Sequence, residues 1–381
     1  MRHALRSMLI VALLAACAEE DPEATRRDGG ATDAGGGQPS DGGGATDGDG
    51  AVDCGDYDFP GNGDNADCES LAGNYQPGAD DDWPTCISDD GEYHPFQKSV
   101  SSTARVAAFE EIAELLFAGE TPSAEDFTDA RLAYAVDEGL DSRVARREDE
   151  HYPPAPEACR DLTPEEQQEY ADRCVGPARI QPILNDAFAR GMSGEEPREN
   201  AARIEAALLW FLYLSVHKEA TTCTTTPADC DSSWAYYTGG EPIEEPLGLG
   251  RAVHRHSEQA HHATFDGILA VRCWRDLDNP TGPAEDLELR DAAIGQMDRA
   301  LLRGVALLVR ARFERLARAC EDERPPLWAF LQILGPVLDR EASARDEDAA
   351  GALRDELARD DPNAVDTAAA ISAIDAIFPC P

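Results

Sequence analysis

Apolar residues recur at three- and four-residue intervals through most of the chain from Val100 onward, which is the spacing of amphipathic helices. Alternating, strand-like patterns are nearly absent. We therefore expect an all-α fold, an antiparallel helical bundle across residues 98–381. Two four-helix halves joined near residues 190–200 would fit the pattern equally well. The predicted helices cover residues 101–118, 123–149 with an interruption at Gly139, 164–174, 178–190, 197–220, 231–237, 249–273, 286–320, 326–341, 347–358 and 364–377.

The most apolar segment of the body lies within the predicted helix 197–220. Residues 207–214 read Ala-Leu-Leu-Trp-Phe-Leu-Tyr-Leu and are hydrophobic on every side of a helix, which predicts a central, buried helix. His217 follows in the last turn, where the helix dipole favours a histidine. It is also a candidate ligand that a neighbouring helix could share.

The N-terminus has the features of an export signal. Arg2 and Arg6 precede a short apolar stretch that is too short to remain as a membrane span. The sequence Leu14-Ala15-Ala16-Cys17 resembles the lipobox of bacterial lipoproteins, in which the cysteine is acylated after cleavage. This resemblance implies a signal peptide over residues 1–16 and a lipid anchor on Cys17. Alanine rather than aspartate at the next position implies the outer membrane, with the protein facing the periplasm or the cell surface. The alternative is an ordinary signal peptide with a chance cysteine.

Two irregular segments separate this signal from the predicted helices. Residues 17–53 consist largely of Gly, Asp, Ala and Thr and have almost nothing to bury, which predicts a disordered tether. Residues 54–97 are rich in Asp, Gly, Asn and Pro and contain three cysteines. This composition predicts an irregular N-terminal cap that disulfides hold in place.

The cysteine content fits an oxidising compartment. Eleven cysteines leave ten, an even number, once Cys17 is acylated. Short spacings favour the disulfides Cys223–Cys230 and Cys159–Cys174, and Cys380 is expected to tie the C-terminal tail to the body. The partners of the remaining cysteines stay open; these are Cys54, Cys68, Cys86, Cys273 and Cys320.

The chain has a formal charge of −42 at pH 7. A field of this sign disfavours binding to nucleic acid and adsorption to anionic lipid, and it favours cations. The Gly-x-Ser-x-Gly, phosphate-loop, Gly-x-Gly-x-x-Gly and His-Glu-x-x-His motifs are all missing. The sequence therefore indicates neither a catalytic residue nor a nucleic-acid partner.

Four of the eight histidines lie between residues 254 and 262, inside the predicted helix 249–273. In a continuous helix His254, Glu258 and His261 would share one face, and His256 would point toward the core. Imidazole and carboxylate ligands in this combination suit a transition metal, with iron favoured and zinc or copper as alternatives. A carboxylate or His217 from a neighbouring helix would complete the coordination. The competing interpretation is a solvated or structural histidine face.

Aspartates in the predicted cap are a weaker candidate for a cation site, in this case for calcium. Their spacing does not match the twelve-residue EF-hand loop, because the downstream glutamate is missing. Ordinary acidic turns are the favoured interpretation. The residues concerned are Asp53, Asp56, Asp58, Asp64, Asp67 and the run Asp80-Asp81-Asp82.

Several short phrases between residues 100 and 340 are shared, in order and spacing, with one family. They are Gly139-Leu-Asp-Ser-Arg-Val, Asp231-Ser-Ser-Trp-Ala-Tyr-Tyr-Thr-Gly-Gly, the start of the predicted helix at Leu249, and Pro326-Leu-Trp-Ala-Phe-Leu-Gln-Ile-Leu-Gly-Pro. In these the chain resembles the low-iron-inducible periplasmic proteins of algae, the iron-assimilation proteins, and their bacterial lipoprotein relatives. The resemblance implies an all-helical fold and a role in iron capture outside the cytoplasmic membrane.

These observations predict a lipid-anchored, extracytoplasmic metal-binding protein that takes part in iron capture or uptake. Its expected partners are the bilayer, through the acylated Cys17, a metal ion, and an outer-membrane uptake protein. The alternative is a non-catalytic surface lipoprotein that binds a protein or a glycan without a metal.

Overall fold

Every regular element in the described part of the chain is helical, which confirms the all-α prediction. The computed structural model describes residues 63–78, 81–119, 121–135 and 139–381. The predicted signal peptide, Cys17, the tether and the start of the cap lie outside these residues. In chain order the α-helices are α1 (Ser102–Leu116), α2 (Ala124–Ala135), α3 (Leu140–Val144), α4 (Pro164–Glu169), α5 (Gln181–Met192), α6 (Pro197–Thr222), α7 (Ala228–Thr238), α8 (Gly248–His254), α9 (Glu258–Leu277), α10 (Leu287–Arg318), α11 (Arg324–Leu334), α12 (Asp339–Arg345), α13 (Glu347–Leu357) and α14 (Thr367–Ile377).

Helix α6 is the centre of the fold, as its uniformly apolar sequence predicts. Residues 206–217 are buried without interruption, so every side of this part of the helix faces protein. Helices α5, α7, α10 and α11 pack directly against it. Because α6 touches so many neighbours, residues on its last turns lie inside the protein rather than at a surface.

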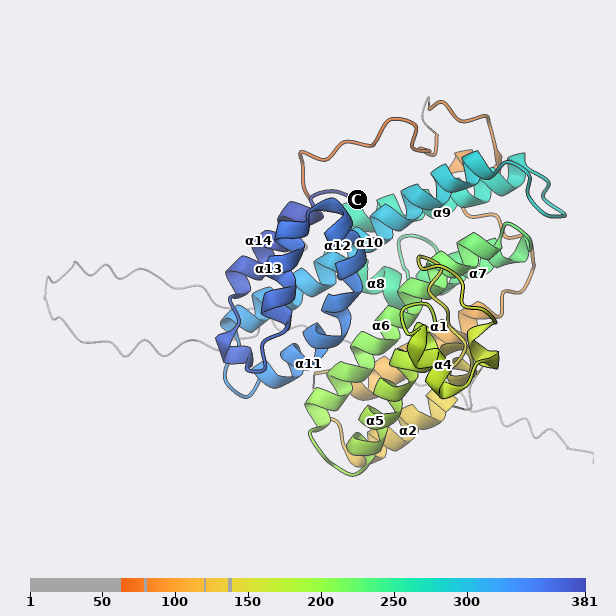
Figure 1. The fold of residues 1–381 in the computed structure, drawn as a ribbon. Coiled ribbons are helices and arrows are strands. Elements are labelled where there is room, and N and C mark those ends of the chain that lie inside the picture. The colour runs from red at the N-terminus through yellow and green to blue at the C-terminus, as the bar shows by residue number, and fades with distance from the viewer. Residues whose placement is uncertain (1–62, 79–80, 120, 136–138) are drawn as a thin grey trace, which may run out of the picture. The chain divides into compact units, whose positions relative to one another are not determined.

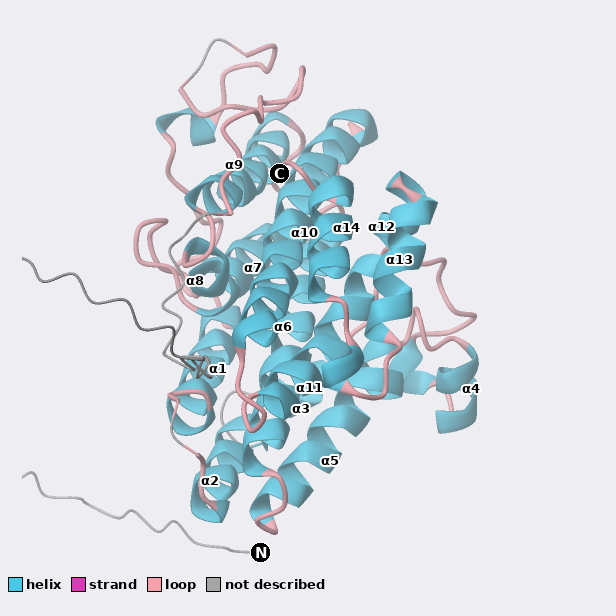
Figure 2. Ribbon diagram, turned by 90° about the vertical axis from the view of Figure 1, so that its left-hand side faces the viewer, coloured by secondary structure: helices cyan, strands magenta, loops and turns pink. Residues whose placement is uncertain are grey.

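The other helices are arranged around α6 and the long helix α10 (Figures 1 and 2). Helices α1, α2 and α5 gather on one side, and α12, α13 and α14 gather on another. Helix α9 lies alongside α10, where a Cβ atom on Gly267 would come within 2.3 Å of the Cα atom of Met297. The described residues belong to one compact unit. The helices therefore make a single bundle and not two four-helix halves.

Disulfides connect segments both near and far apart in sequence. Cys223–Cys230 and Cys159–Cys174 are bonded, the two pairs that the short spacings favour. Cys380 is bonded to Cys68, so the C-terminal tail is tied to the cap. Cys86 pairs with Cys273 on α9, and Cys320 is also disulfide-bonded.

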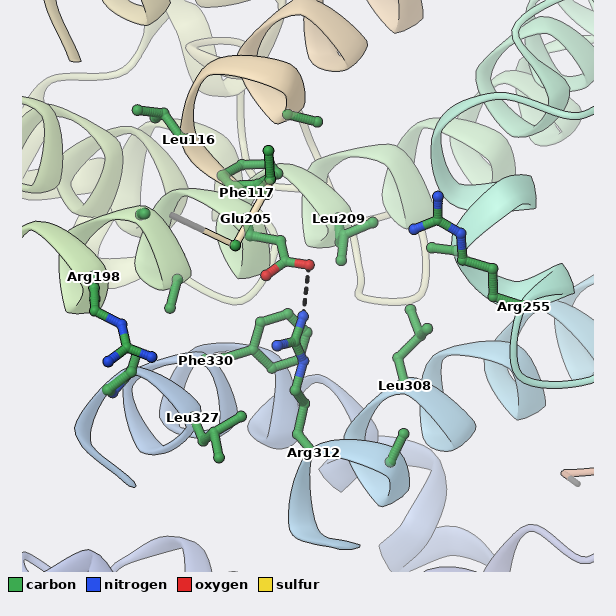
Figure 3. A pocket seen from close by; sticks show the side chains of 18 of the residues that line it. Leu116, Phe117, Arg198, Glu205, Leu209, Arg255, Leu308, Arg312, Leu327 and Phe330 are labelled. Atoms are coloured by element: carbon green, nitrogen blue, oxygen red, sulfur yellow. Dashed lines mark hydrogen bonds and ion pairs between the residues drawn. The ribbon is translucent and has the colours of Figure 1, made fainter. Parts of the chain in front are cut away.

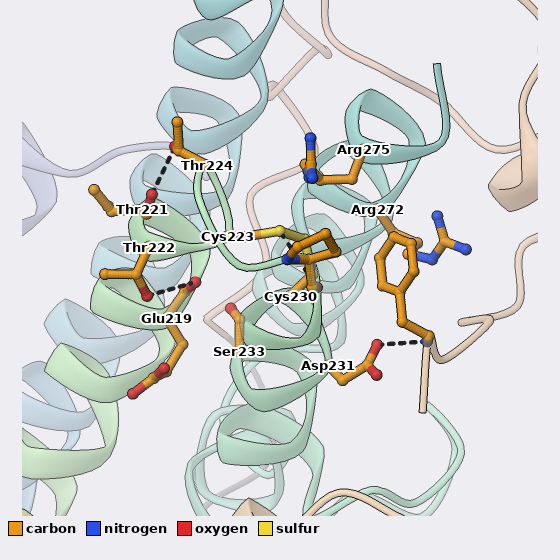
Figure 4. The surroundings of a disulfide bond; sticks show 12 residues. Glu219, Thr221, Thr222, Cys223, Thr224, Cys230, Asp231, Ser233, Arg272 and Arg275 are labelled. Carbon is orange, nitrogen blue, oxygen red and sulfur yellow. Dashed lines mark hydrogen bonds between the residues drawn. A yellow bond between two sulfur atoms is a disulfide. The ribbon is translucent and has the colours of Figure 1, made fainter. Parts of the chain in front are cut away.

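The described part of the predicted cap is irregular apart from a short 3₁₀ turn at Ile87–Asp90. Polar contacts fix it to the bundle beside the Cys223–Cys230 disulfide (Figure 4). There the carboxylate of Asp231 accepts hydrogen bonds from the backbone nitrogens of Phe96 and Gln97, at 3.0 and 2.9 Å. The guanidinium of Arg272 on α9 lies over the ring of Phe96 and donates to the carbonyl of His94. The cap is thus held covalently and by polar contacts.

Two helices end earlier than the hydrophobic pattern predicts. The helix expected to continue to residue 149 stops at Val144, and residues 145–158 form a loop. The helix expected over 249–273 breaks after His254 and restarts at Glu258. Both breaks decide where potential metal ligands lie. Within the described ranges, no helix combines the length and the apolar character that crossing a membrane requires.

Candidate metal centre

The predicted ligands His254, Glu258 and His261 do not share one helix face, because the chain turns between α8 and α9. Ser257 caps α9: its backbone is extended and its hydroxyl accepts a hydrogen bond from the backbone nitrogen of Ala260 at 2.9 Å. The same hydroxyl donates to Asp64 at 2.6 Å. A cap contact from a distant part of the chain therefore breaks the helix that the sequence pattern suggests.

Both ring nitrogens of His261 are already engaged. Its Nε2 lies 2.8 Å from the carbonyl oxygen of Ile243, which can only accept, so this nitrogen carries the proton. Its Nδ1 then accepts from the hydroxyl of Tyr237 at 3.0 Å. Burial lowers the pKa of His261 to about 4, so the ring is neutral. The ring stacks on that of His254, with 4.5 Å between centroids, and has no lone pair left for a metal.

The other two predicted ligands of this region also point away from a common ion. The Glu258 side chain is 74% exposed and lies 3.7 Å from His262. Burial, together with Arg312, Arg255 and Arg315, lowers the pKa of His256 to about 4, and those positive charges also disfavour a metal cation. His254, Glu258 and His261 therefore do not converge on one point in the described structure.

Asp64 and Asp81, two of the aspartates considered for calcium, behave as turn residues. Asp64 accepts from Ser257 and from the backbone nitrogen of Gln259, and Asp81 accepts from the backbone nitrogens of Gln76 and Trp83. These contacts fit the interpretation as acidic turns. Asp53, Asp56, Asp58 and Asp80 lie outside the described residues.

His217, the remaining predicted ligand, does lie among potential metal ligands. One nitrogen each from His151 and His217 and one carboxylate oxygen of Asp298 lie within 4.8 Å of one another. The three come from three separate segments: the loop after α3, the last turns of α6, and the middle of α10. A second group, Asp90, Glu92 and His94, lies at the surface of the cap, where Asp90 and His94 already pair at 2.8 Å.

His151 lies between two carboxylates. Its Nδ1 is 2.6 Å from Asp149, and its Nε2 is 3.2 Å from Asp298. The ring stacks on His217 with 3.7 Å between centroids and 18° between planes. The imidazole, both carboxylates and His217 are largely shielded from solvent. A carboxylate on Nδ1 is the arrangement that orients a metal-binding histidine, because it leaves Nε2 facing the ion.

Arg173 holds the loop that carries Asp149 and His151. Its guanidinium donates to the carbonyl oxygens of Asp149 and Tyr152, each at 3.1 Å. It also pairs with Glu148 and Glu150 on the same loop. Because Cys174 follows directly and is bonded to Cys159, the clamp is fixed covalently beside the loop. Four of the five residues 148–152 are therefore held by one buried arginine.

The start of this loop is held by close backbone packing. Arg147 is buried, pairs with Glu219 of α6 at 3.1 Å, and lies over the ring of Phe211. Gly176, the first residue of a short π-helical turn that leads into α5, donates its backbone N–H to the carbonyl of Arg147. A Cβ atom there would come within 2.2 Å of the carbonyl oxygen of Val144. Only glycine permits this approach.

Electrostatics give the two stacked histidines different charges. Burial alone would lower the pKa of His151, but the hydrogen bonds to Asp149 and Asp298 outweigh it and raise that pKa to about 9. Burial lowers the pKa of His217 to about 4, and the charge of His151 acts in the same direction. Burial opposes ionisation of Asp298, yet the two imidazoles hold its pKa well below the usual range. At neutral pH an imidazolium therefore faces a neutral imidazole.

The donor set fits a transition metal. A proton on His151 Nε2 occupies the position where an ion would sit, and the described residues donate no hydrogen bond to the ring nitrogens of His217. Two imidazoles and one carboxylate are ligands that iron(II), zinc and copper accept, with further positions left open. A cavity of about 40 Å³ lined by Tyr152, Tyr213 and Arg340 adjoins the centre. This volume holds roughly three water molecules.

Sequence reasoning missed His151 and Asp298. His151 follows the end of the predicted helix 123–149, and nothing local marks it as a ligand. Asp298 does carry a signal, because it shares a face of α10 with the buried residues Ile294, Leu301 and Val305. An acid in a core-facing position requires a charged or hydrogen-bonding partner. Comparison of the chain with family models, with curated proteins and with solved structures found no match.

Proposed function

We propose that this protein is a lipid-anchored, extracytoplasmic protein that binds a transition metal, most favourably iron, at His151, His217 and Asp298. The observation that carries this proposal is the convergence of three ligand atoms within 4.8 Å in a largely buried site. Asp149 holds the Nδ1 of His151, as a carboxylate behind a ligand histidine does in metal sites. The family resemblance favours iron, and the acidic chain attracts cations from solution.

Binding requires an exchange of a proton for the metal. His151 must release the proton on Nε2, whereas His217 is already neutral and Asp298 already ionised at neutral pH. Tyr213 lies 3.4 Å from the second oxygen of Asp298, and Arg340 lies 4.0 Å from the carboxylate, so both hold its orientation. The protein's part in capture is therefore a preformed pocket that gives up one proton per ion bound.

The anchor rests on the lipobox resemblance at residues 14–17. A tether on Cys17 would keep the metal site at the membrane, where an outer-membrane uptake protein would receive the ion. Mass spectrometry of the mature N-terminus tests this step, because acylation adds the mass of the lipid chains. We also expect a Cys17→Ser variant to be recovered from the soluble fraction with its metal site intact.

Metal titration of the secreted Cys17→Ser chain tests the site. His217→Gln should lose most of the affinity, because it removes one of three ligands. His262→Gln is the matched control, since that histidine is half exposed, pairs with the exposed Glu258 and lies edge-on to His261, away from the proposed ligands. Equal affinities in the two variants would show that the metal does not bind at this centre.

A rival function has its own support, because His151 is already satisfied by two carboxylates without an ion. In that case the centre is a buried ion-pair network that fixes the loop, and the protein binds a protein or glycan partner instead. Demetallated protein that still captures an outer-membrane partner, together with no metal in protein purified from its native envelope, would favour this rival.

A further inference from the structure

A phenolic oxygen lies beside the three proposed metal ligands. Tyr213 comes one helical turn before His217 on α6, so the two side chains leave the same face of that helix. Tyr213 is 3% exposed, and its hydroxyl donates to Oδ1 of Asp298 at 3.4 Å. Its ring is nearly parallel to that of His151, with 5.9 Å between centroids and 9° between planes. Tyr213 therefore lies beside two of the proposed ligands and shares a helix face with the third.

The hydrogen bond of this phenol is long. Hydroxyl groups usually donate to oxygen at about 2.7–2.8 Å, and in this protein Ser257 donates to Asp64 at 2.6 Å. A buried phenol normally has a close partner for its hydroxyl. At 3.4 Å the contact with Asp298 is weak, so the oxygen of Tyr213 is available to a stronger partner, such as an ion held by the same carboxylate.

Tyr213 also lines the cavity of about 40 Å³ that adjoins the centre, together with Asp149 and His151. Arg340 lines the same cavity and acts electrostatically on the phenol. A positive charge beside a phenol favours the phenolate form. The surroundings of Tyr213 therefore combine free space with a charge that stabilises a negatively charged oxygen.

A larger cavity, of about 820 Å³, differs in this respect. It lies between α1, α6, α8, α10 and α11 (Figure 3). Five arginines and four glutamates border it, so positive charge is in excess there. Its glutamates have partners, since Arg312 pairs with Glu205 at 2.6 Å and Arg251 pairs with Glu110. This lining disfavours a metal ion, in contrast to the small cavity at Tyr213.

A fourth ligand that carries a negative charge matters most for a trivalent ion. Relative to a divalent ion, a trivalent ion adds one positive charge to a centre that is largely shielded from solvent. Uncompensated charge is costly in such a place. Loss of the phenolic proton of Tyr213 removes the added charge. A divalent ion at His151, His217 and Asp298 has no such need and leaves Tyr213 protonated.

The kind of donor favours the same ion. Iron(III) is a hard ion that prefers negatively charged oxygen ligands, whereas zinc and copper accept imidazole readily. Tyrosine is an axial ligand of iron in some haem proteins. With Tyr213 the centre offers two imidazoles, a carboxylate and a phenolate, from α6, α10 and the loop after α3 (Figure 1).

We propose that Tyr213 is a fourth protein ligand of the metal centre and that its phenolate makes the centre select iron(III) over divalent ions. This inference rests on the proposed function, because it requires an ion at His151, His217 and Asp298. On binding, the phenolic O–H bond breaks, the oxygen coordinates the ion and the proton passes to solvent, with no transfer of electrons. The form of iron that the protein captures is then the oxidised ion.

Visible absorption of the full mature protein tests the ligand, with iron(III) supplied as its nitrilotriacetate complex. A phenolate bound to iron(III) gives a charge-transfer band in the visible range, and resonance Raman excitation in this band enhances the ring vibrations of the phenolate. We expect the band in the unaltered protein and its loss in Tyr213→Phe. Tyr152→Phe is the matched control, because this tyrosine also lines the small cavity and its loss should leave the band unchanged. Iron-loaded unaltered protein without the band, or loss of the band in the control, would overturn the proposal.

Affinities for two ions separate this inference from the proposed function. Tyr213→Phe should keep its zinc affinity within about threefold, while its iron(III) affinity should fall by more than about a hundredfold, because only the trivalent ion needs the phenolate. Retained zinc binding also shows that the variant is folded. Equal losses for both ions would mean that Tyr213 only positions Asp298, which overturns the inference. Zinc binding that depends on His217 without any preference for iron(III) removes the inference alone, whereas unaltered protein that binds neither ion removes the metal centre as well.

Discussion

The histidine-rich segment at residues 254–262 and the cluster of His151, His217 and Asp298 contrast in every property that matters for binding a metal. The first places four histidines within nine residues, yet it spans a helix break and directs its side chains to different partners. The second draws single residues from three distant segments into one shielded point. A short segment rich in potential ligands is therefore weaker evidence for a metal site than a buried histidine beside a carboxylate.

The contrast has a physical reason. A histidine at the surface satisfies its nitrogens with water, while a buried histidine must find protein partners or a metal. His261 finds a hydroxyl and a carbonyl, which together use both nitrogens. His151 finds two carboxylates, which raise its pKa and favour any cation at Nε2, whether that cation is a proton or a metal ion.

Substitution of Asp298 should cause the largest change in metal affinity. Asp298→Asn removes the only carboxylate among the three proposed ligands, so affinity should fall by more than about a hundredfold, beyond the effect of losing an outer-shell partner. Isothermal titration with zinc, which does not change oxidation state, measures the loss. If the zinc affinity of the variant stays within a few-fold of that of the unaltered protein, the metal binds at another site.

The pH dependence of binding should be nearly as large. Because the pKa of His151 is about 9 and that of His217 about 4, one proton is released per metal ion between these values. Affinity should therefore rise about tenfold per pH unit, or about a hundredfold from pH 5.5 to 7.5. Zinc titrations in buffers with different heats of ionisation count the released protons directly. A profile that levels off above pH 6.5 would indicate an ordinary, unpaired histidine.

Asp149 should have an intermediate effect, because it touches His151 and not the ion. Asp149→Asn weakens the orientation and basicity of His151, which typically costs tenfold to about a hundredfold in affinity. The same change lowers the pKa of His151, so competition from the proton falls and the net loss near pH 7 should be about tenfold. An NMR titration of the His151 ring should show a pKa below 9. An unchanged pKa would mean that Asp298 alone sets it.

The fold was more predictable than the site, for reasons that individual residues show. The apolar positions of α6 and α10 depend on local periodicity, so the sequence reveals both helices. The break before Glu258 depends on Ser257 and on Asp64, which lies 193 residues away. The loop at His151 depends on Arg173 and on the close approach of Gly176. Contacts of that range leave no local pattern.

The sequence does not reveal the three residues of the proposed site equally well. His217 was recognisable as a candidate because it ends a uniformly apolar helix. Asp298 could have been recognised as an acid on the buried face of α10, beside Leu301. His151 could not, because its role arises only when the loop folds against α6. Sequence patterns indicate which faces are buried, and a polar residue on such a face is the informative exception.

The smallest change in metal affinity is expected for substitutions in the histidine-rich segment at residues 254–262. A large change there would overturn the contrast between the two regions. His254→Gln/Glu258→Gln should leave metal affinity within about twofold, because neither side chain faces the proposed centre. Its cost in unfolding free energy should be about 1 kcal/mol, since Glu258 is an exposed acid in the first turn of α9 with one loose contact to His262, and His254 contributes a ring stacked on His261. Zinc titration and urea unfolding of the same preparation measure both. A loss of affinity here comparable to that of Asp298→Asn would show that metal binding rearranges the α8–α9 break, and it would restore the sequence-dense histidines as ligands.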